Sequence, residues 1–221
     1  METLNHLFDH LSINSDIIDV VTEIIDNIEN EVNKEISVLS DLLITKNDYT
    51  IQSEPTLKLA HLYCVKNKLS GQQAGPLVEN YIINHFNMKK NNSSLLTGDA
   101  THREKNYEIK VSFGGKDRNK FNYVQLRMNH ECSYLLTAYY LSDANVHSFG
   151  DLFVFRVDKK SIMGIISKFG SYAHGTVKKL GPINMETISA INNNREYALR
   201  VKYMSPCWKE LLKFRIDPSN I

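Results

Sequence analysis

The sequence predicts an α/β domain in which helices flank a central mixed β-sheet, preceded by an acidic helical region. Residues 95–157 contain several strand-like segments, and helical patterns lie before and after them, an order typical of one sheet covered by helices. The length of 221 residues suits one domain with an appendage, and a hydrophobic content of 42% is enough to form a core.

Charge divides the chain near residue 46. Residues 1–46 contain ten acids and two lysines, whereas residues 47–221 contain 24 basic and 15 acidic residues. Between residues 15 and 44, apolar residues recur at steps of three or four, as on one face of a helix. This helix is expected either to pack on the domain or to mediate dimerisation. The excess of basic residues in 47–221 favours nucleic acid as a partner only weakly.

The elements of the domain follow from periodicity and turn residues. A short helix is expected at 55–67, and a second begins at Gly75-Pro76, because proline is tolerated in a first helical turn. Strands are expected at 95–99, 107–112, 122–129, 133–141, 152–157 and 197–204, helices at 158–169 and after Ser205-Pro206, and a basic loop at 171–183. In strand 122–129, alternation predicts that Tyr123 shares a face with Gln125 and Arg127.

The stretch GDATHREKNYEIKVS, residues 98–112, brings two carboxylates and one ammonium together. As a hairpin that turns in THREKN, it places Asp99 at the end of one strand beside Glu108 on the next, and Lys110 shares a face with Glu108. Adjacent carboxylates repel each other unless a cation lies between them, and Mg²⁺ prefers such oxygen ligands. All three side chains have a use in metal-assisted phosphodiester hydrolysis, with Glu79 as a third acid or second-metal ligand. A surface hairpin with one ion pair is the alternative.

A second set of similar composition lies further along the chain, where Asp151 precedes Asp158-Lys159-Lys160. The segment between the two acids, LFVFRV, has the pattern of one continuous strand. At ~3.3 Å per residue its flanking acids lie about 23 Å apart, so they cannot share a metal ion. The turn between Asp99 and Glu108 therefore makes the first set the better candidate.

The order of these residues resembles the PD-(D/E)XK nuclease core, with Asp99 followed by Glu108-x-Lys110 on a strand, after a helix that carries Glu79. Gly98 stands where the family name has proline. Residues 70–185 resemble, within that superfamily, a Type II restriction endonuclease. This resemblance implies that Asp99, Glu108 and the carbonyl of Ile109 bind Mg²⁺, that Lys110 assists the attacking water, and that Gln125 supports the site.

The resemblance implies a Mg²⁺-dependent enzyme that cuts double-stranded DNA at a specific short sequence, paired in function with a DNA methyltransferase. A homodimer is expected because one site cuts one strand and a palindromic site has two-fold symmetry. Two alternatives are a structure-selective nuclease of the same fold, such as a junction resolvase or repair nuclease, and a non-catalytic DNA-binding protein. Three widely spaced cysteines and the lack of a signal peptide or membrane span predict a cytoplasmic protein.

Polar and basic residues near the hairpin, in the loop after it and in the basic loop are candidates for DNA contact, because such side chains bind base edges and phosphates. Each one taken singly is more often a solvated loop residue, so the clusters count for more than their members. The candidates are Gln72, Gln73, Lys116, Arg118, Asn119, Lys120, Asn122, Tyr123, Arg127, Tyr172, His174, Thr176, Lys178 and Lys179.

Overall fold

The computed structural model describes residues 20–28, 30, 33, 57–92, 95–114, 120–141, 150–190 and 193–221. The chain divides into two units, residues 1–50 and 51–221. In the first unit the described residues are helical, and their apolar side chains, including Val20, Ile24 and Ile28, are about half exposed. Most of the helix predicted at 15–44 lies outside the described residues, so its expected packing or dimerising role stays a prediction.

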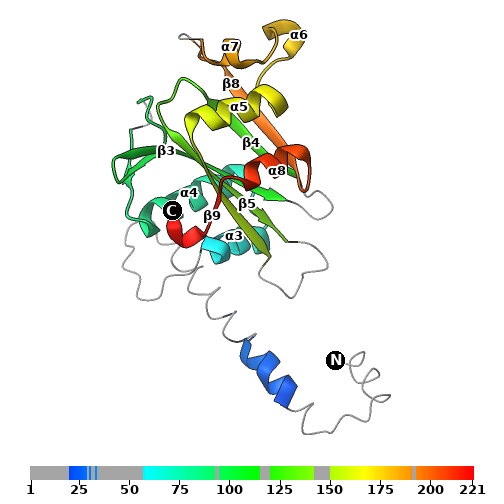
Figure 1. Cartoon of the computed structure of the whole chain (residues 1–221). Coiled ribbons are helices and arrows are strands. Elements are labelled where there is room, and N and C mark those ends of the chain that lie inside the picture. The colour runs from blue at the N-terminus through cyan, green and yellow to red at the C-terminus, as the bar shows by residue number, and fades with distance from the viewer. Residues whose placement is uncertain are drawn as a thin grey trace. The chain divides into compact units, whose positions relative to one another are not determined.

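Six strands of the second unit form a mixed sheet in the spatial order β1-β2-β3-β5-β6-β9 (Figure 1). β3 and β5 run parallel, and the other neighbouring pairs are antiparallel. The apolar strand β5 is buried along almost its whole length, as expected for a strand covered on both faces. The strands are β1 Lys89–Lys90, β2 Ala100–His102, β3 Lys105–Gly114, β5 Ser133–Tyr140, β6 Asp151–Val157 and β9 Arg215–Ile216.

A second, three-stranded antiparallel sheet was not anticipated from the sequence. It contains β4 Lys120–Arg127, β8 Glu196–Lys202 and β7 Ser171–Tyr172, in that spatial order. A β-bulge between Tyr123 and Leu126 interrupts the alternation of β4, and Gln125 there has a φ of 56°. Tyr123 is consequently 1% exposed and Val124 40% exposed. The prediction that Tyr123 and Gln125 share a face is therefore wrong, because the bulge adds a residue to the strand.

The helices of the second unit cover both sheets (Figure 1). The helix predicted at Gly75-Pro76 starts earlier, at Gly71, because Ser70 and Gln73 form a capping box there and Pro76 lies inside the helix. No helix in the described part of the chain is long and apolar enough to cross a membrane. The helices are α3 Leu57–Lys66, α4 Gly71–His85, α5 Lys159–Phe169, α6 Val177–Leu180, α7 Met185–Ile188, α8 Pro206–Leu212 and the 3-10 helix Pro218–Asn220.

The two sheets share one hydrophobic core with α5 and α8. Trp208 of α8 stacks on Phe121 of β4 at 5.2 Å between ring centroids and meets Phe155 of β6 edge-on at 5.4 Å. This packing ties β4 to the central sheet although the two are not hydrogen-bonded as neighbours. α4 packs against β3, so the helix that carries Glu79 lies beside the strand that carries Glu108 and Lys110.

Candidate active site

The predicted hairpin forms, but its first strand begins after Asp99 instead of ending there. β2 and β3 are joined at Arg103 and Glu104, which have φ values of 46° and 65°, as in the tight turns that match strand twist. The Asp99 N–H donates to the carbonyl of Tyr107 at 2.8 Å, and Asp99 Oδ2 accepts from the N–H of Ile109 at 2.7 Å. These two bonds fix the carboxylate of Asp99 beside β3.

Gly98 makes this close approach possible. Its φ is 73°, and a Cβ at this position would lie 2.7 Å from the carbonyl oxygen of Tyr107. Only glycine adopts such a conformation readily and leaves room for the neighbouring backbone. Proline could not replace Gly98 in this conformation, because its ring fixes φ at about −65°.

Glu108 is an acid buried to 3% exposure, and both of its carboxylate oxygens have partners. Oε1 lies 2.6 Å from Nζ of Lys110, and Oε2 lies 3.2 Å from Nδ1 of His130. A buried carboxylate needs such partners to offset the loss of water. The expected pairing of Glu108 with Lys110 on one strand face is therefore present, and His130 is an addition that the sequence did not reveal.

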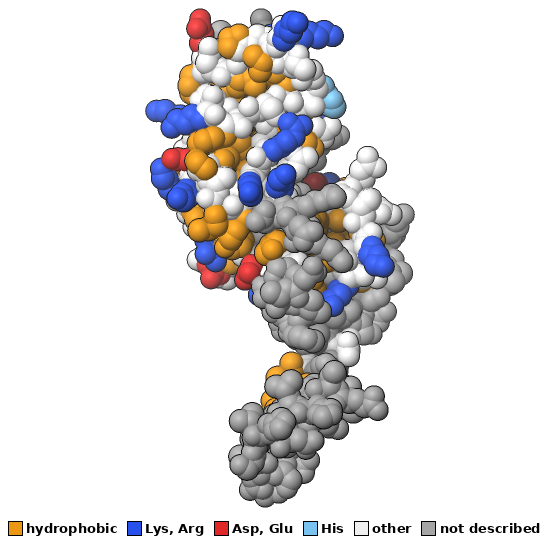
Figure 2. Space-filling view, turned by 90° about the vertical axis from the view of Figure 1, so that its right-hand side faces the viewer, with side chains coloured by type: hydrophobic (Ala, Val, Ile, Leu, Met, Phe, Trp, Pro, Cys, Tyr) orange, Lys and Arg blue, Asp and Glu red, His pale blue; other side chains and the backbone are white. Residues whose placement is uncertain are grey.

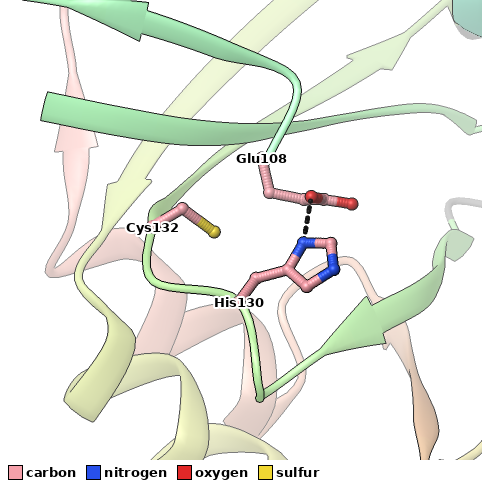
Figure 3. A group of neighbouring side chains, drawn as sticks. All are labelled: Glu108, His130 and Cys132. Atoms are coloured by element: carbon pink, nitrogen blue, oxygen red, sulfur yellow. Dashed lines mark hydrogen bonds and ion pairs between the residues drawn. The ribbon is translucent and has the colours of Figure 1, made fainter. Parts of the chain in front are cut away.

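Cys132 is the third buried side chain of this group (Figure 3). One donor atom each from Glu108, His130 and Cys132 lie within 4.8 Å of one another. His130 and Cys132 occupy the turn between β4 and β5, and the parallel register of Tyr107 with Ser133 brings this turn beside Glu108. The local sequence signal is the spacing His130-x-Cys132, and this spacing does not identify Glu108 on β3 as the third member of the group.

Carboxylates crowd together around Asp99. Burial raises the pKa of Glu79 to about 7, and the charge of Asp99 contributes to the same shift. The pKa of Asp99 is also raised, chiefly by burial and then by the charge of Glu108, while Lys110 opposes both shifts. Such mutual repulsion favours a bound cation, since an opposite charge stabilises the ionised form of all three acids.

The backbone of Ile109 adds a further oxygen at the same place. In a strand the N–H and C=O of one residue point to the same side, and the N–H of Ile109 points to Asp99. The pairing of β2 with β3 extends only from His102 and Lys105 to Ala100 and Tyr107, so the carbonyl of Ile109 is directed past the end of the β2 ladder. Carboxylate and carbonyl oxygens are the ligand type that Mg²⁺ prefers.

A cleft of about 990 Å³ opens beside this group, between α3, α4, β3 and β4. Glu79, Lys110 and Gln125 all line it, so the structure brings these three predicted residues to one cavity. Asp99 and Glu108 do not line the cleft, whereas Lys110, which pairs with Glu108, does. The bulge at Gln125 exposes this side chain to the cleft, and such unusual backbone conformations are frequent at functional sites.

The candidates for DNA contact fall into separate groups. Tyr123 and Tyr172 are buried in the core, which contradicts a role at a surface; the hydroxyl of Tyr123 donates to the carbonyl of Thr137 at 3.2 Å. Gln73 accepts the bonds of the α4 cap, and Arg127 forms an ion pair with Glu196 at 2.6 Å. Lys116, Arg118 and Asn119 lie outside the described residues.

The remaining candidates are exposed, but they do not form one surface. Gln72 and Asn122 line the cleft, whereas the basic loop carries its residues at α6, which lies apart from α4 (Figure 1). On the face drawn in Figure 2, Lys and Arg side chains are spread over the domain and do not gather in one patch. The exposed residues are Gln72, Lys120, Asn122, His174, Thr176, Lys178 and Lys179.

No protein-family model and no curated protein matches this chain. A functional assignment therefore depends on the chemistry of the site. Its central feature is the convergence of Asp99, Glu108 and Lys110 on one hairpin, beside a cleft that Glu79 also lines.

Proposed function

We propose that the protein is a Mg²⁺-dependent endodeoxyribonuclease of the PD-(D/E)XK type. The observation that carries this proposal is the hairpin geometry: Asp99 is held against the backbone of Ile109, and Lys110 contacts Glu108 two residues along the same strand. Burial, followed by the charge of a neighbouring carboxylate, raises the pKa values of Asp99 and Glu79, and a cation at this place would offset both effects.

In this proposal Asp99, Glu108 and the carbonyl of Ile109 hold Mg²⁺, which when bound polarises a phosphodiester and lowers the pKa of a coordinated water. Lys110 lines the cleft, and its ammonium would orient the attacking water and stabilise negative charge on the scissile phosphate. Glu79 lines the cleft as a third acid, and a bound cation would favour the ionised form that serves as a second-metal ligand. Gln125 supplies a neutral donor and acceptor at the wall of the cleft.

The finer proposal is a cytoplasmic Type II restriction endonuclease that acts as a homodimer on a short duplex sequence and is paired in function with a DNA methyltransferase. Its support is the resemblance of residues 70–185, together with the exposed polar residues Gln72 and Asn122 in the cleft. Amide side chains of this kind read base edges by paired hydrogen bonds. Two-fold symmetry would place one cleft on each strand of a palindromic site.

The test is incubation of long genomic DNA with the purified protein and Mg²⁺, beside Asp99→Ala, Lys110→Ala and an EDTA control. Asp151→Ala is the matched control, because Asp151 is an exposed acid at the start of β6. Discrete fragments from the native and Asp151→Ala proteins alone would support a sequence-specific nuclease with its chemistry on the hairpin. A smear, or preference for branched DNA, would favour a structure-selective nuclease. Intact DNA without Mg²⁺ binding would contradict catalysis.

A further inference from the structure

We propose that Glu108, His130 and Cys132 form a transition-metal site, suited to Zn²⁺, whose occupancy excludes Mg²⁺ from the hairpin and so inhibits cleavage. The binding of Zn²⁺ is independent of the proposed nuclease function, and only the inhibition rests on it. The site joins β3 to the turn between β4 and β5, and it takes one oxygen, one nitrogen and one sulfur donor from the chain (Figure 3).

The distances are close to those of a metal centre. Two ligands that each lie ~2.0 Å from a tetrahedral Zn²⁺ are about 3.3 Å apart. Nδ1 of His130 and Oε2 of Glu108 are 3.2 Å apart, and the sulfur of Cys132 completes a triangle within 4.8 Å. The two side chains of the turn need only a small movement toward Glu108, and the turn is not part of either sheet ladder.

The donor types select the ion. Thiolate and imidazole bind Zn²⁺ and other transition metals, whereas Mg²⁺ takes oxygen ligands. Three protein ligands leave a fourth position for water. All three side chains are at most 7% exposed, so a bound ion would be held away from bulk solvent. Binding displaces the proton of the Cys132 thiol to solvent and uses the neutral imidazole of His130 with its remaining proton on Nε2, and it needs no oxidant.

The link to the nuclease site is the single carboxylate of Glu108. Its Oε1 already pairs with Lys110, and its Oε2 faces His130. Zn²⁺ on Oε2 would leave neither oxygen free to hold Mg²⁺ together with Asp99. The two metals therefore compete although their other ligands differ. The expected inhibition is relieved by more Mg²⁺ and depends on Cys132, which has no part in the proposed catalytic set.

Binding is measured with Co²⁺ as the probe, in the absence of DNA, because thiolate ligation of Co²⁺ gives a charge-transfer absorption. The native protein should bind one Co²⁺ with this band, Zn²⁺ should abolish it, and Cys132→Ser should lack it. Cys207→Ser is the matched control, because both cysteines are 6% exposed in the core. Cys132→Ala is the second variant, and near-native thermal unfolding shows that each variant is folded. A native protein without the band, or a Cys132→Ser protein that keeps it, would overturn the site.

Inhibition is measured as DNA cleavage at fixed Mg²⁺ with rising Zn²⁺. Cys132→Ser should need at least about 10-fold more Zn²⁺ than the native and Cys207→Ser proteins for the same inhibition, as loss of a ligand weakens metal binding. Equal sensitivity of all three proteins would overturn the competition. If none cleaves DNA, the nuclease proposal fails while the cobalt band still decides the metal site. In that case excess Mg²⁺ should weaken the cobalt absorption band, because both metals use Glu108. A band that excess Mg²⁺ leaves unchanged would contradict the competition for Glu108.

Discussion

Asp99 and Asp158 each belong to a stretch that combines acids with lysine, yet the fold gives their carboxylates opposite surroundings. Asp158 is the N-cap of α5 and accepts bonds from the N–H of Ser161 at 2.9 Å and from its hydroxyl at 2.6 Å, which lower its pKa. Asp99 also accepts a backbone bond, but burial and the charge of Glu108 outweigh it and raise its pKa.

The difference comes from topology and not from composition. β6 is one continuous strand, so Asp151 lies at its start and Asp158 directly after its end. The turn at Arg103 and Glu104 instead folds Asp99 back toward Glu108. An acid whose hydrogen bonds are satisfied at a helix start is structural, whereas acids that crowd one another beside a cleft mark a candidate for chemistry.

The largest expected effect separates these two acids by activity. Asp99→Asn should reduce DNA cleavage at least about 100-fold, because it removes a charge that the metal and the transition state need. Asp158→Asn keeps a side chain that caps helices and should leave the cleavage rate unchanged. Both rates are measured under single-turnover conditions with excess protein. An equal loss of cleavage in the two variants would contradict the proposal that Asp99 acts in catalysis while Asp158 has only a structural role.

The glycines of the two regions should also respond in opposite ways. Gly98→Ala places a Cβ 2.7 Å from the carbonyl of Tyr107 at a φ of 73°, and it should lower the free energy of unfolding by roughly 2 kcal/mol. A Cβ at Gly164, inside α5, meets nothing within 4 Å, so Gly164→Ala should raise stability by ~0.5–1 kcal/mol. Urea unfolding of both variants measures their free energies of unfolding relative to the native protein. An unchanged free energy of unfolding in Gly98→Ala would show that the backbone at Gly98 does not require glycine.

Glu79 gives a pH dependence of defined sign. In the folded protein the carboxyl of Glu79 stays protonated up to about pH 7, because its pKa is raised. In the unfolded chain the same carboxyl loses its proton near 4.5, the ordinary pKa. The unfolded state thus binds fewer protons in this window, and the free energy of unfolding falls as pH rises through it. Glu79→Gln should be more stable than the native protein above pH 7 by roughly 1 kcal/mol, with the advantage fading toward pH 4.5, since solvent screens this half-buried group.

Urea midpoints at intervals between pH 4 and pH 8 measure this difference, with Mg²⁺ omitted. Added Mg²⁺ should reduce the stability difference between Glu79→Gln and the native protein, because a bound cation stabilises the ionised form of Glu79. A difference that is constant across the range would assign the effect of Glu79→Gln to packing instead of charge.

The smallest expected effect is that of Asp158→Ala, with the opposite pH dependence. The variant loses the cap of α5 and should be about 0.5–1 kcal/mol less stable at neutral pH. The pKa of Asp158 is lowered in the folded protein, so its contribution is present above the ordinary pKa and is lost as pH falls through the lowered value. Thermal unfolding at several pH values measures it, and a deficit that grows in acid would contradict the capping role.

Elements with a strong local signal were predicted well from the sequence. The strand expected at 152–157 and the helix at 158–169 correspond to β6 Asp151–Val157 and α5 Lys159–Phe169, because an apolar run and an amphipathic pattern meet at the cap Asp158. α4 starts before Gly75-Pro76 because the capping box of Ser70 and Gln73 sets its first turn, and Pro76 lies inside the helix. Proline inside a helix costs stability, but packing against β3 can offset it.

Features that depend on distant partners were not predictable in the same way. β4 pairs with β8, which follows it only after three further strands and three helices, so its place in a second sheet has no local signature. The bulge at Gln125 reverses the faces of β4, and the strand contains no glycine or proline that would indicate a bulge from the sequence. His130 and Cys132 reach Glu108 only through the parallel register of β3 and β5. Parallel pairing joins segments far apart in sequence, which periodicity cannot identify.

The left-handed backbone at Gly98 also limits which residues can precede Asp99. A pattern that begins with proline demands a φ near about −65°, whereas this hairpin is entered at 73°. Proline at position 98 is thus incompatible with the conformation that places Asp99 beside β3. A text search for a proline–aspartate pair would pass over the chain. The feature that identifies this hairpin is structural: a residue with positive φ, Gly98, directly precedes an acid that accepts a hydrogen bond from the N–H of Ile109.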